Sequence, residues 1–320
     1  MQLFITAALT LLLALTPFQT RAETYPSRPI KLVLPFGAGS ASDALARMAA
    51  TELAKLMGQP VVVAPKPGAN GSLAAVEVMR AAPDGYTFLF GTNSPLAVVP
   101  NLMKEPPYDV MKAFTPIMFL GENTFFITVN PSVPAKSLSE FIAYAKANPN
   151  KLNYASGNTF AIVATSLFTS AAGIEMLHVP YKTEPDAILD LLSGRIQLMN
   201  STPTTVLPHI RGGKLRALAT TLTKRSPLLP DVPTLIEQGQ PKLPVSPWFA
   251  LVGPAGLPPE IVARMNKDMT TVLNNPTVNG QMQAQGFSPQ PTNPEQLKQY
   301  LIEQLAIWKS AIKTAGIPQQ

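Results

Sequence analysis

The chain has 320 residues with no cysteine, and its 25 Lys and Arg against 19 Asp and Glu give a formal net charge of +6. Such a modest charge, without a basic cluster or interleaved aromatic residues, argues against nucleic-acid binding, although it favours an acidic ligand through long-range attraction. The lack of cysteine excludes thiolate metal sites and thiol nucleophiles. It also fits an exported protein that is large enough to fold without disulfides, as in a bacterial periplasm.

The first 22 residues have the features of a secretory signal peptide. Residues 3–16 read LFITAALTLLLALT, an apolar run shorter than the ~20 residues that span a bilayer. Thr20 and Ala22 place small residues at −3 and −1 of a cleavage site after Ala22. Because Met1-Gln2 adds only the terminal amine as positive charge, an uncleaved anchor is the alternative. Cleavage leaves 320 − 22 = 298 residues, a length typical of two domains.

Strand-like and helix-like segments alternate along the first part of the mature chain. The apolar pattern predicts strands at 30–34, 61–63 and 86–90, with helices at 41–57 and 73–81 between them. This alternation is typical of a parallel sheet whose two faces are covered by helices.

A second alternating series follows. It predicts strands at 125–129, 152–154, 176–179 and 196–199, with helices at 138–147, 162–172 and 185–192. Further strands at 215–221 and 249–252 precede two closing helices at 259–273 and 294–315. The order predicts an α/β protein of two lobes, each a mainly parallel sheet flanked by helices.

The long closing helices indicate that the chain returns to its first lobe. Lobe 1 is therefore predicted to comprise residues 23–124 and 248–320, and lobe 2 residues 125–247. Crossings near Thr124–Phe126 and Pro247–Trp248 would form a two-segment hinge, the arrangement in which a cleft closes on a ligand.

The loop after the first strand is the first candidate binding feature. Residues 32–47 read LVLPFGAGSASDALAR, a strand that opens through glycines and serines into a helix. This nearly matches a dinucleotide fingerprint, but Ser42 stands where the third glycine belongs. The next strand ends in Lys66 without the acidic residue that holds an NAD ribose, so a coenzyme is disfavoured.

A small carboxylate suits the same loop better. Ser40 and Asp43 have the spacing of a capping box, which predicts that Asp43 satisfies backbone N–H groups at the helix start. The remaining first-turn N–H groups, together with the helix dipole, can hold a carboxylate without an arginine.

Residues suited to catalysis are scarce. The only histidines are His178 and His209, and neither a G-x-S-x-G elbow nor an H-E-x-x-H motif occurs. Two isolated histidines without cysteine do not make a metal site. The sequence therefore predicts no catalytic residue, metal or cofactor, and a secreted enzyme that relies on carboxylates is the alternative class.

Five segments, in order over essentially the whole mature chain, resemble the Bug/TctC family, the periplasmic solute-binding receptors of tripartite tricarboxylate transporters. They are YPSRPIKLVLPFGAGSASD (25–43), PKPGANGSLAAVEVMRAAPDGYTFLFGT (65–92), FIAYAKANPNKLNYASG (141–157), HVPYKTEPDAILDLLSGRIQ (178–197) and LPHIRGGKLRALA (207–219). The resemblance implies a monomeric, type II-like periplasmic binding protein that is not an enzyme. It would close on a small carboxylate and deliver it to membrane permease subunits; signalling to a sensor kinase is a further alternative.

The resemblance also implies where the ligand lies. It places the ligand between the loop after the first strand, at Phe36, Gly39, Ser40, Ala41 and Ser42, and a Ser/Gly-rich loop of lobe 2, at Ser156, Gly157, Asn158 and Thr159. Both loops precede helices, so each helix start would hold one end of a diacid. Ligands of open α/β sheets lie at the ends of strands. Four more predicted site residues lie at such strand ends: Thr92, Asn93, Tyr181 and Asn200.

Departures from the family pattern predict the kind of ligand. Phe160 replaces part of a usually polar stretch, Ser40 replaces a usual glycine, and Asn200-Ser201 replaces a usual Phe-Asp. The pocket is therefore expected to have gained apolar surface and lost one acid, which disfavours amino acids. If Phe36 and Phe160 face the ligand's midpoint, an aromatic dicarboxylate such as terephthalate is expected, and an aliphatic di- or tricarboxylate is the alternative. The alternative for the two rings is that each turns into the core of its own lobe, since Phe160 also begins the apolar face continued by Val163 and Leu167.

Overall fold

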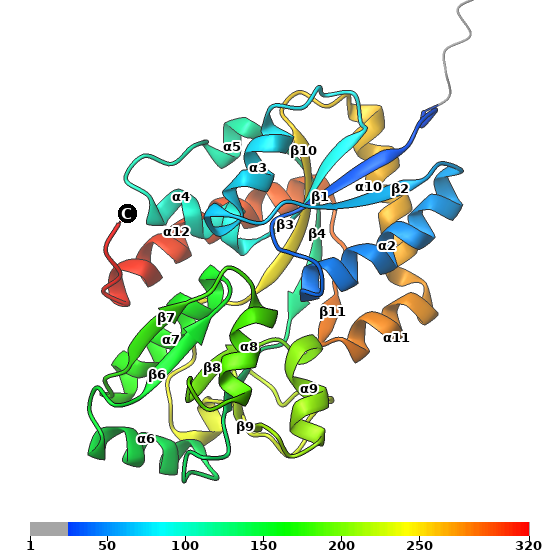
Figure 1. The fold of residues 1–320 in the computed structure, drawn as a ribbon. Helices are drawn as coiled ribbons and strands as arrows, with labels where there is room; N and C mark the ends of the chain where they lie inside the picture. Colours follow the sequence, from blue (N-terminus) through cyan, green and yellow to red (C-terminus); the bar gives the residue numbers. More distant parts are fainter. Residues whose placement is uncertain (1–24, 320) are drawn as a thin grey trace, which may run out of the picture.

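The computed structural model describes residues 25–319 and shows two sheets, each covered by helices (Figure 1). The predicted signal peptide lies outside the described residues. Among the helices of residues 25–319, none combines the length and apolar character that crossing a bilayer requires.

Lobe 1 is built on a six-stranded sheet. Its order is β11 (Phe287–Pro289), β4 (Phe114–Asn123), β10 (Trp248–Pro254), β3 (Thr87–Thr92), β1 (Ile30–Leu34) and β2 (Val61–Pro65). Strand β1, next to the edge strand β2, pairs parallel with β2 and β3, whereas β10 runs antiparallel to β3 and β4.

The helices of lobe 1 cover both faces because β1 alternates its side chains between them. Ile30, Leu32 and Leu34 pack in the cluster formed with α2 (Ala41–Met57), α10 (Pro259–Asn274) and α11 (Pro276–Ala284). Val33 faces the other cluster, formed with α3 (Ser72–Met79), the π-helical η3 (Ser94–Val98), α4 (Val99–Leu102), α5 (Val110–Ala113) and α12 (Pro294–Thr314).

Lobe 2 is built on a five-stranded sheet. Its order is β7 (Leu177–Pro180), β6 (Asn153–Ser156), β8 (Leu198–Ser201), β5 (Phe126–Val129) and β9 (Arg216–Thr220). One face packs on α6 (Leu138–Ala147) and α7 (Thr159–Ala172), and the other on α8 (Glu184–Leu192) and α9 (Pro203–Arg211). The short 3-10 turns η2 (Ala69–Gly71) and η4 (Ile236–Gln238) lie in connecting loops.

The predicted two-lobed α/β fold is confirmed, but the prediction of mainly parallel sheets is wrong. Each sheet is mixed: β1 with its neighbours and β6 with its neighbours are parallel, whereas the β4, β5 and β10 pairings are antiparallel. Strands β5 and β10, which directly follow the two crossings between the lobes, run antiparallel to both of their neighbours, and the edge strand β11 runs antiparallel to β4. The pattern also missed β4, β11, α9 and α11, and β4 carries a proline and a glycine that interrupt its apolar run.

The chain passes between the lobes twice, and the two crossing segments lie side by side. β4 ends at Asn123 and β5 begins at Phe126, while β10 begins at Trp248. The Asn123 N–H donates to the carbonyl oxygen of Pro247 at 2.9 Å, which ties the two crossings together. The crossings lie at Thr124–Phe126 and Pro247–Trp248, the two segments predicted to form a hinge, and hinge motion about them stays a prediction.

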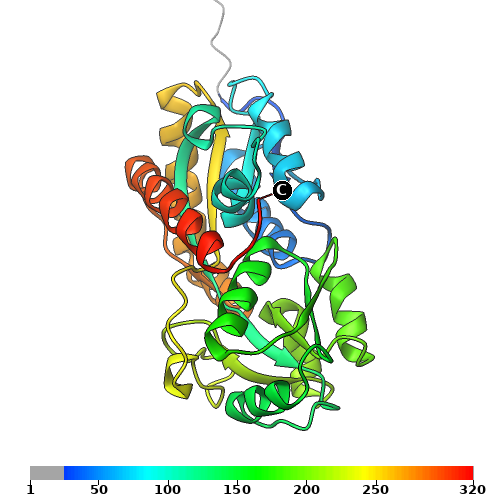
Figure 2. The same cartoon turned by 90° about the vertical axis from the view of Figure 1, so that its left-hand side faces the viewer.

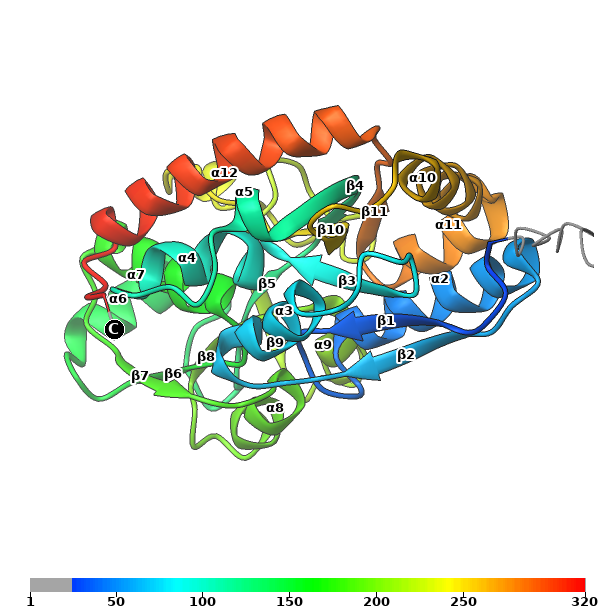
Figure 3. The ribbon, with the colours of Figure 1, turned by 90° about the horizontal axis from the view of Figure 1, so that it is seen from above.

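Helix α12 belongs to lobe 1 but reaches lobe 2. Figures 2 and 3 show it running along lobe 1 until its C-terminal end lies beside α7. There the ring of Trp308 meets the ring of Phe160 edge-on, with 6.3 Å between centroids. A second bridge between the lobes is the hydrogen bond from Thr159 Oγ1 to Ser94 Oγ at 2.5 Å.

Candidate ligand-binding site

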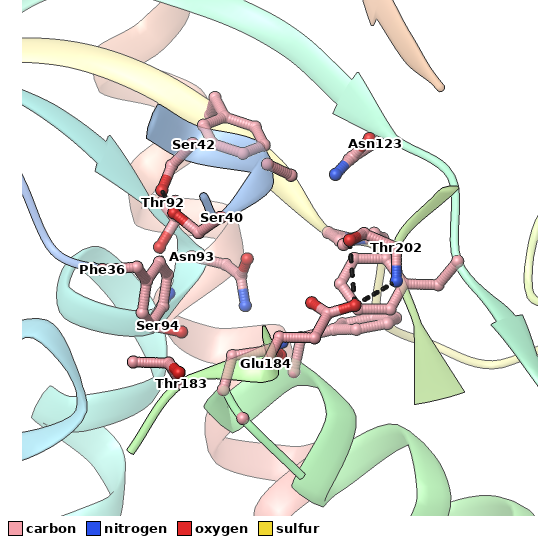
Figure 4. A pocket seen from close by; sticks show the side chains of 17 residues that line it. Phe36, Ser40, Ser42, Thr92, Asn93, Ser94, Asn123, Thr183, Glu184 and Thr202 are labelled. Atoms are coloured by element: carbon pink, nitrogen blue, oxygen red, sulfur yellow. Dashed lines mark hydrogen bonds between the residues drawn. The ribbon is translucent and has the colours of Figure 1, made fainter. Parts of the chain in front are cut away.

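A cavity lies between the lobes, where strands of both sheets end and helices begin (Figure 4). About 490 Å³ of space between the lining residues is not filled by protein atoms, and this space includes open solvent at the mouth of the cavity. Lobe 1, lobe 2 and the crossings between them all contribute to its wall. The lining residues are Phe36, Ser40, Ala41, Ser42, Thr92, Asn93, Ser94, Asn123, Phe125, Gly157, Asn158, Phe160, Thr183, Glu184, Thr202, Pro247 and Phe249.

Nine of the fourteen residues predicted for the site line this cavity: Phe36, Ser40, Ala41, Ser42, Thr92, Asn93, Gly157, Asn158 and Phe160. They come from both lobes, so the structure brings the two predicted helix starts to one place. Gly39, Ser156, Thr159, Tyr181 and Asn200 are not among the lining residues.

The start of α2 keeps its own cap and leaves donors for a ligand. Ser40 Oγ accepts from the Asp43 N–H at 3.3 Å and donates to the Gly37 carbonyl at 2.7 Å. The Asp43 carboxylate accepts from the Gly39 N–H at 3.1 Å and from Arg47 Nε at 2.9 Å. Asp43 therefore serves the helix start, as the spacing predicted. The N–H groups in the first turn of a helix have no hydrogen-bond partner within that helix. Ala41 and Ser42 line the cavity, so their N–H groups can donate to a ligand there.

The start of α7 supplies the opposing wall. Asn158 caps the helix through its Oδ1, which accepts from the Ala161 N–H at 2.9 Å. The preceding residue must be small, since a Cβ on Gly157 would lie 2.4 Å from the backbone nitrogen of Glu184. The entry loops of α7 and α8 are thus packed backbone to backbone.

Three of the predicted site residues that do not line the cavity are bonded elsewhere. Tyr181 donates to Asp190 Oδ2 at 2.5 Å, a bond that raises the pKa of Tyr181 to about 12, and its ring lines a neighbouring hollow. Ser156 Oγ bonds His178 Nε2 at 2.6 Å, and Thr159 bonds Ser94 across the lobes. Placement at a strand or helix end did not determine which way each side chain points.

The other two non-lining residues serve the backbone or the sheet. Gly39 adopts φ +78°, a left-handed conformation that suits glycine in the turn before α2. Asn200 is 1% exposed within β8, beside Ile127 of β5, so it is buried inside lobe 2.

Phe160 contributes less to the ligand surface than predicted. Its side chain is 1% exposed, and its ring packs against Phe125 with 4.6 Å between centroids and against Trp308. The ring therefore belongs mainly to the core beneath the cavity. Phe36, Phe125 and Phe249 complete an aromatic wall around the polar groups.

Glu184 is the charged residue among the cavity-lining residues that the sequence did not predict. It is 6% exposed at the first position of α8, yet its carboxyl group lines the cavity. Its Oε1 accepts hydrogen bonds from the Thr202 N–H at 2.6 Å, Thr202 Oγ1 at 2.9 Å and Thr205 Oγ1 at 2.6 Å. Burial raises the pKa of Glu184 above its ordinary value, and these hydrogen bonds oppose part of that rise.

The sequence predicts the loss of one acid, at Asn200-Ser201, and the cavity nevertheless holds another acid, Glu184. Glu184 is the only ionisable residue among the lining residues, and no Lys or Arg accompanies it. A signal for it was present, because Glu184 begins the helix after a lobe 2 strand, the same strand-to-helix position that singled out the other loops.

The arrangement is suited to holding a small anion. Four helices of at least nine residues, α2, α7, α8 and α9, begin at the cavity, and serine, threonine and asparagine side chains add neutral donors. Within residues 25–319, no group of three or more His, Cys, Asp or Glu side chains is placed to hold a metal ion.

Comparison with known proteins gives a consistent picture. Residues 45–317 match the family described as "Tripartite tricarboxylate transporter family receptor". Protein BugT of Bordetella pertussis is 35% identical over 298 residues, covering 92% of this chain and 91% of BugT. Among solved structures, Rpa4515 of R. palustris with adipate has a TM-score of 0.88 at 32% identity, covering 92% of this chain and 99% of Rpa4515. MatC of Rhodopseudomonas palustris with bound malate has a TM-score of 0.84 at 30% identity, covering 90% and 100%.

Proposed function

The chain belongs to the tripartite tricarboxylate transporter receptor family, and on that premise we propose that it captures a small carboxylate in the periplasm and delivers it to the permease subunits of a tripartite transporter. It is a solute-binding receptor and not an enzyme. The signal peptide would direct export and be cleaved after Ala22. The observation that carries the proposal is the cavity between two lobes at which four helix N-termini meet.

The carboxylate class rests on two further supports. Two relatives of similar fold are described with adipate and with malate. In this chain, first-turn N–H groups and the hydroxyl groups of Ser42 and Thr92 stand at the cavity without a cationic side chain. Such donors hold a carboxylate through charge-assisted hydrogen bonds.

An aromatic spacer is supported by the cavity wall. Phe36, Phe125, Phe160 and Phe249 all line the cavity, although Phe160 is 1% exposed. A flat ring gains about 0.5–1.5 kcal/mol from such faces beyond simple burial. Citrate would instead place a hydroxyl and a third carboxylate against them, and each unpartnered polar group costs about 2 kcal/mol or more. Terephthalate is therefore the leading candidate.

Calorimetric titration of the mature protein tests this ligand class. We expect terephthalate to bind at least about tenfold more tightly than citrate, malate, succinate or benzoate, since ~1.4 kcal/mol corresponds to a factor of ten. Phe36→Leu should weaken terephthalate about 2–10-fold and leave an aliphatic diacid such as adipate nearly unchanged. Phe160→Ala is less informative, because Phe160 is 1% exposed and its removal would damage the core. A preference for citrate or malate would refute the aromatic assignment and leave the receptor role intact.

The helix-start account is tested by Ala41→Pro. Ala41 is the first residue of α2, and Ser40 before it has φ −74° and ψ 162°, a conformation that a following proline accepts. The substitution removes one N–H at the cavity and keeps the helix, so we expect the Kd to rise about 10–100-fold. Lys182→Ala serves as the comparison, because Lys182 lines the neighbouring hollow and not the cavity. If Lys182→Ala weakens binding more than Ala41→Pro in folded protein, backbone donors do not hold the ligand.

A further inference from the structure

The two oxygens of the Glu184 carboxyl group have different surroundings. Oε1 accepts from the Thr202 N–H, Thr202 Oγ1 and Thr205 Oγ1, all within 2.9 Å. An oxygen with three donors around it has no room for a proton of its own. When Glu184 is protonated, the proton is therefore on Oε2, which Figure 4 shows directed into the cavity.

Amide donors face the same part of the cavity. Asn93 is 3% exposed, and its Nδ2 has no hydrogen-bond partner among the described residues. Figure 4 shows the side chains of Asn93 and Glu184 pointing toward one another across the cavity. Asn123 Oδ1 accepts from the Thr124 N–H at 3.1 Å, which turns Asn123 Nδ2 toward the cavity. A ligand carboxylate can accept hydrogen bonds from all of these groups. An ammonium group is itself only a donor, so it could not form hydrogen bonds with them.

No neighbouring charge compensates a second anion beside Glu184. Strands β6 and β8, which pack against α8, carry no Asp, Glu, Lys, Arg or His. Burial and the threonine hydrogen bonds are the influences on the pKa of Glu184, without a contribution from a charged group. The charged and titratable groups of the surrounding elements have other partners or positions. Asp43 bonds Arg47, Asp186 bonds Thr183, Asp190 bonds Tyr181 and Arg195, and His178 of β7 bonds Ser156. His209 and Arg211 lie in the last turn of α9, and Lys182 lines the neighbouring hollow.

We propose that Glu184 binds the distal carboxylate of a dicarboxylate ligand as a neutral carboxylic acid, by donating a hydrogen bond from its Oε2–H. The inference rests on the proposed receptor function and narrows its ligand class. A protonated Glu184 would favour the binding of diacids over monoacids, and over acids that carry an ammonium group at the far end. Because a bound carboxylate disfavours ionisation of its neighbour, ligand and proton bind together.

The proton gives binding a defined pH dependence. Burial raises the pKa of Glu184 in the free protein, and a nearby anion raises it further in the complex. Between these two pKa values the complex holds one more proton than the free protein, so affinity falls as pH rises, by up to about tenfold per pH unit.

Substitution at Glu184 tests the proposal with terephthalate as the probe. Glu184→Gln keeps an acceptor for the threonines and an N–H donor toward the cavity, so at pH 6 it should bind within about threefold of wild type. Glu184→Ala lacks the donor and should bind about 10–100-fold more weakly. Between pH 6 and 9, wild type should lose affinity while Glu184→Gln does not, and wild type should take up a proton on binding when calorimetry is repeated in buffers of different ionisation enthalpy.

The opposite pattern overturns the proposal. If Glu184→Gln binds as poorly as Glu184→Ala with both proteins folded, the carboxylate acts as an ionised acceptor. The same conclusion follows if 4-(aminomethyl)benzoate, which has an ammonium group at the far end, binds wild type more tightly than terephthalate does. If no carboxylate binds wild type at any pH, the receptor assignment itself fails, an outcome separate from the other two.

Discussion

Gly157→Ala is expected to abolish most ligand binding and to lower the free energy of unfolding by about 1–3 kcal/mol. A Cβ at this position would lie 2.4 Å from the Glu184 nitrogen, 2.5 Å from its Cα and 2.7 Å from the Thr183 carbonyl carbon. All three are backbone atoms, so no rotamer change relieves the overlap, and the entry loops of α7 and α8 must move apart.

The consequence for binding follows from what these loops carry. Separation displaces the α7 N–H groups and the Glu184 carboxyl group from a ligand that both must reach. Loss of one hydrogen bond to a charged acceptor costs about 1.5–3 kcal/mol, so the Kd should rise at least about 10–100-fold. Titration and denaturant unfolding of the same preparation measure both effects.

Gly280→Ala is the matched control. Gly280 lies in α11 with open space around its Cα, so alanine should stabilise the helix by up to about 1 kcal/mol and leave binding unchanged. If Gly157→Ala bound the ligand as tightly as wild type does, the close approach of the α7 and α8 entry loops would not be what positions the site.

Gln304→Leu is expected to cause the largest loss of stability, about 2–6 kcal/mol of unfolding free energy. Gln304 is 7% exposed in α12, and its Oε1 accepts from Trp248 Nε1 at 2.9 Å and from Trp308 Nε1 at 3.1 Å. Leucine removes the acceptor and leaves two buried donors unsatisfied, at about 1–3 kcal/mol each. Trp248 begins β10 at one crossing and Trp308 contacts Phe160, so the damage falls where the lobes meet.

Denaturant unfolding followed by tryptophan fluorescence measures this effect. Gln299→Leu is the control, because Gln299 lies on the same helix but is exposed and bonds only Glu303; surface substitutions of this kind usually change stability by less than about 0.5 kcal/mol. Equal stability of the Gln304 and Gln299 variants would mean that the two indoles find other acceptors.

Much of the fold was predictable because its signals are local. The helices at 41–57 and 138–147 begin and end where the pattern placed them, since each has a serine cap and a continuous apolar face. The strand at 30–34 was equally clear, because it is buried on both faces and bounded by a proline. The capping role of Asp43 also followed from spacing alone.

The direction of the strands was not predictable from the same signals. Apolar runs in β4, β5 and β10 mark them as strands but carry no information about which neighbour each one joins. Their antiparallel pairing results from the double crossing between lobes, a property of the whole chain path. Alternation of strands and helices therefore suggested more parallel pairing than the sheets contain.

The sequence by itself determined the α/β class, the two lobes, the family and the two facing helix starts, because periodicity, caps and motifs act over a few residues. Only the tertiary structure decided which side chains meet at the cavity. Glu184 reaches the start of α9, 18 residues along the chain, and Phe160 turns toward Trp308 in the core. Such contacts depend on where separate elements pack, so the acid that lines the cavity became visible only once α8 and α9 were placed side by side.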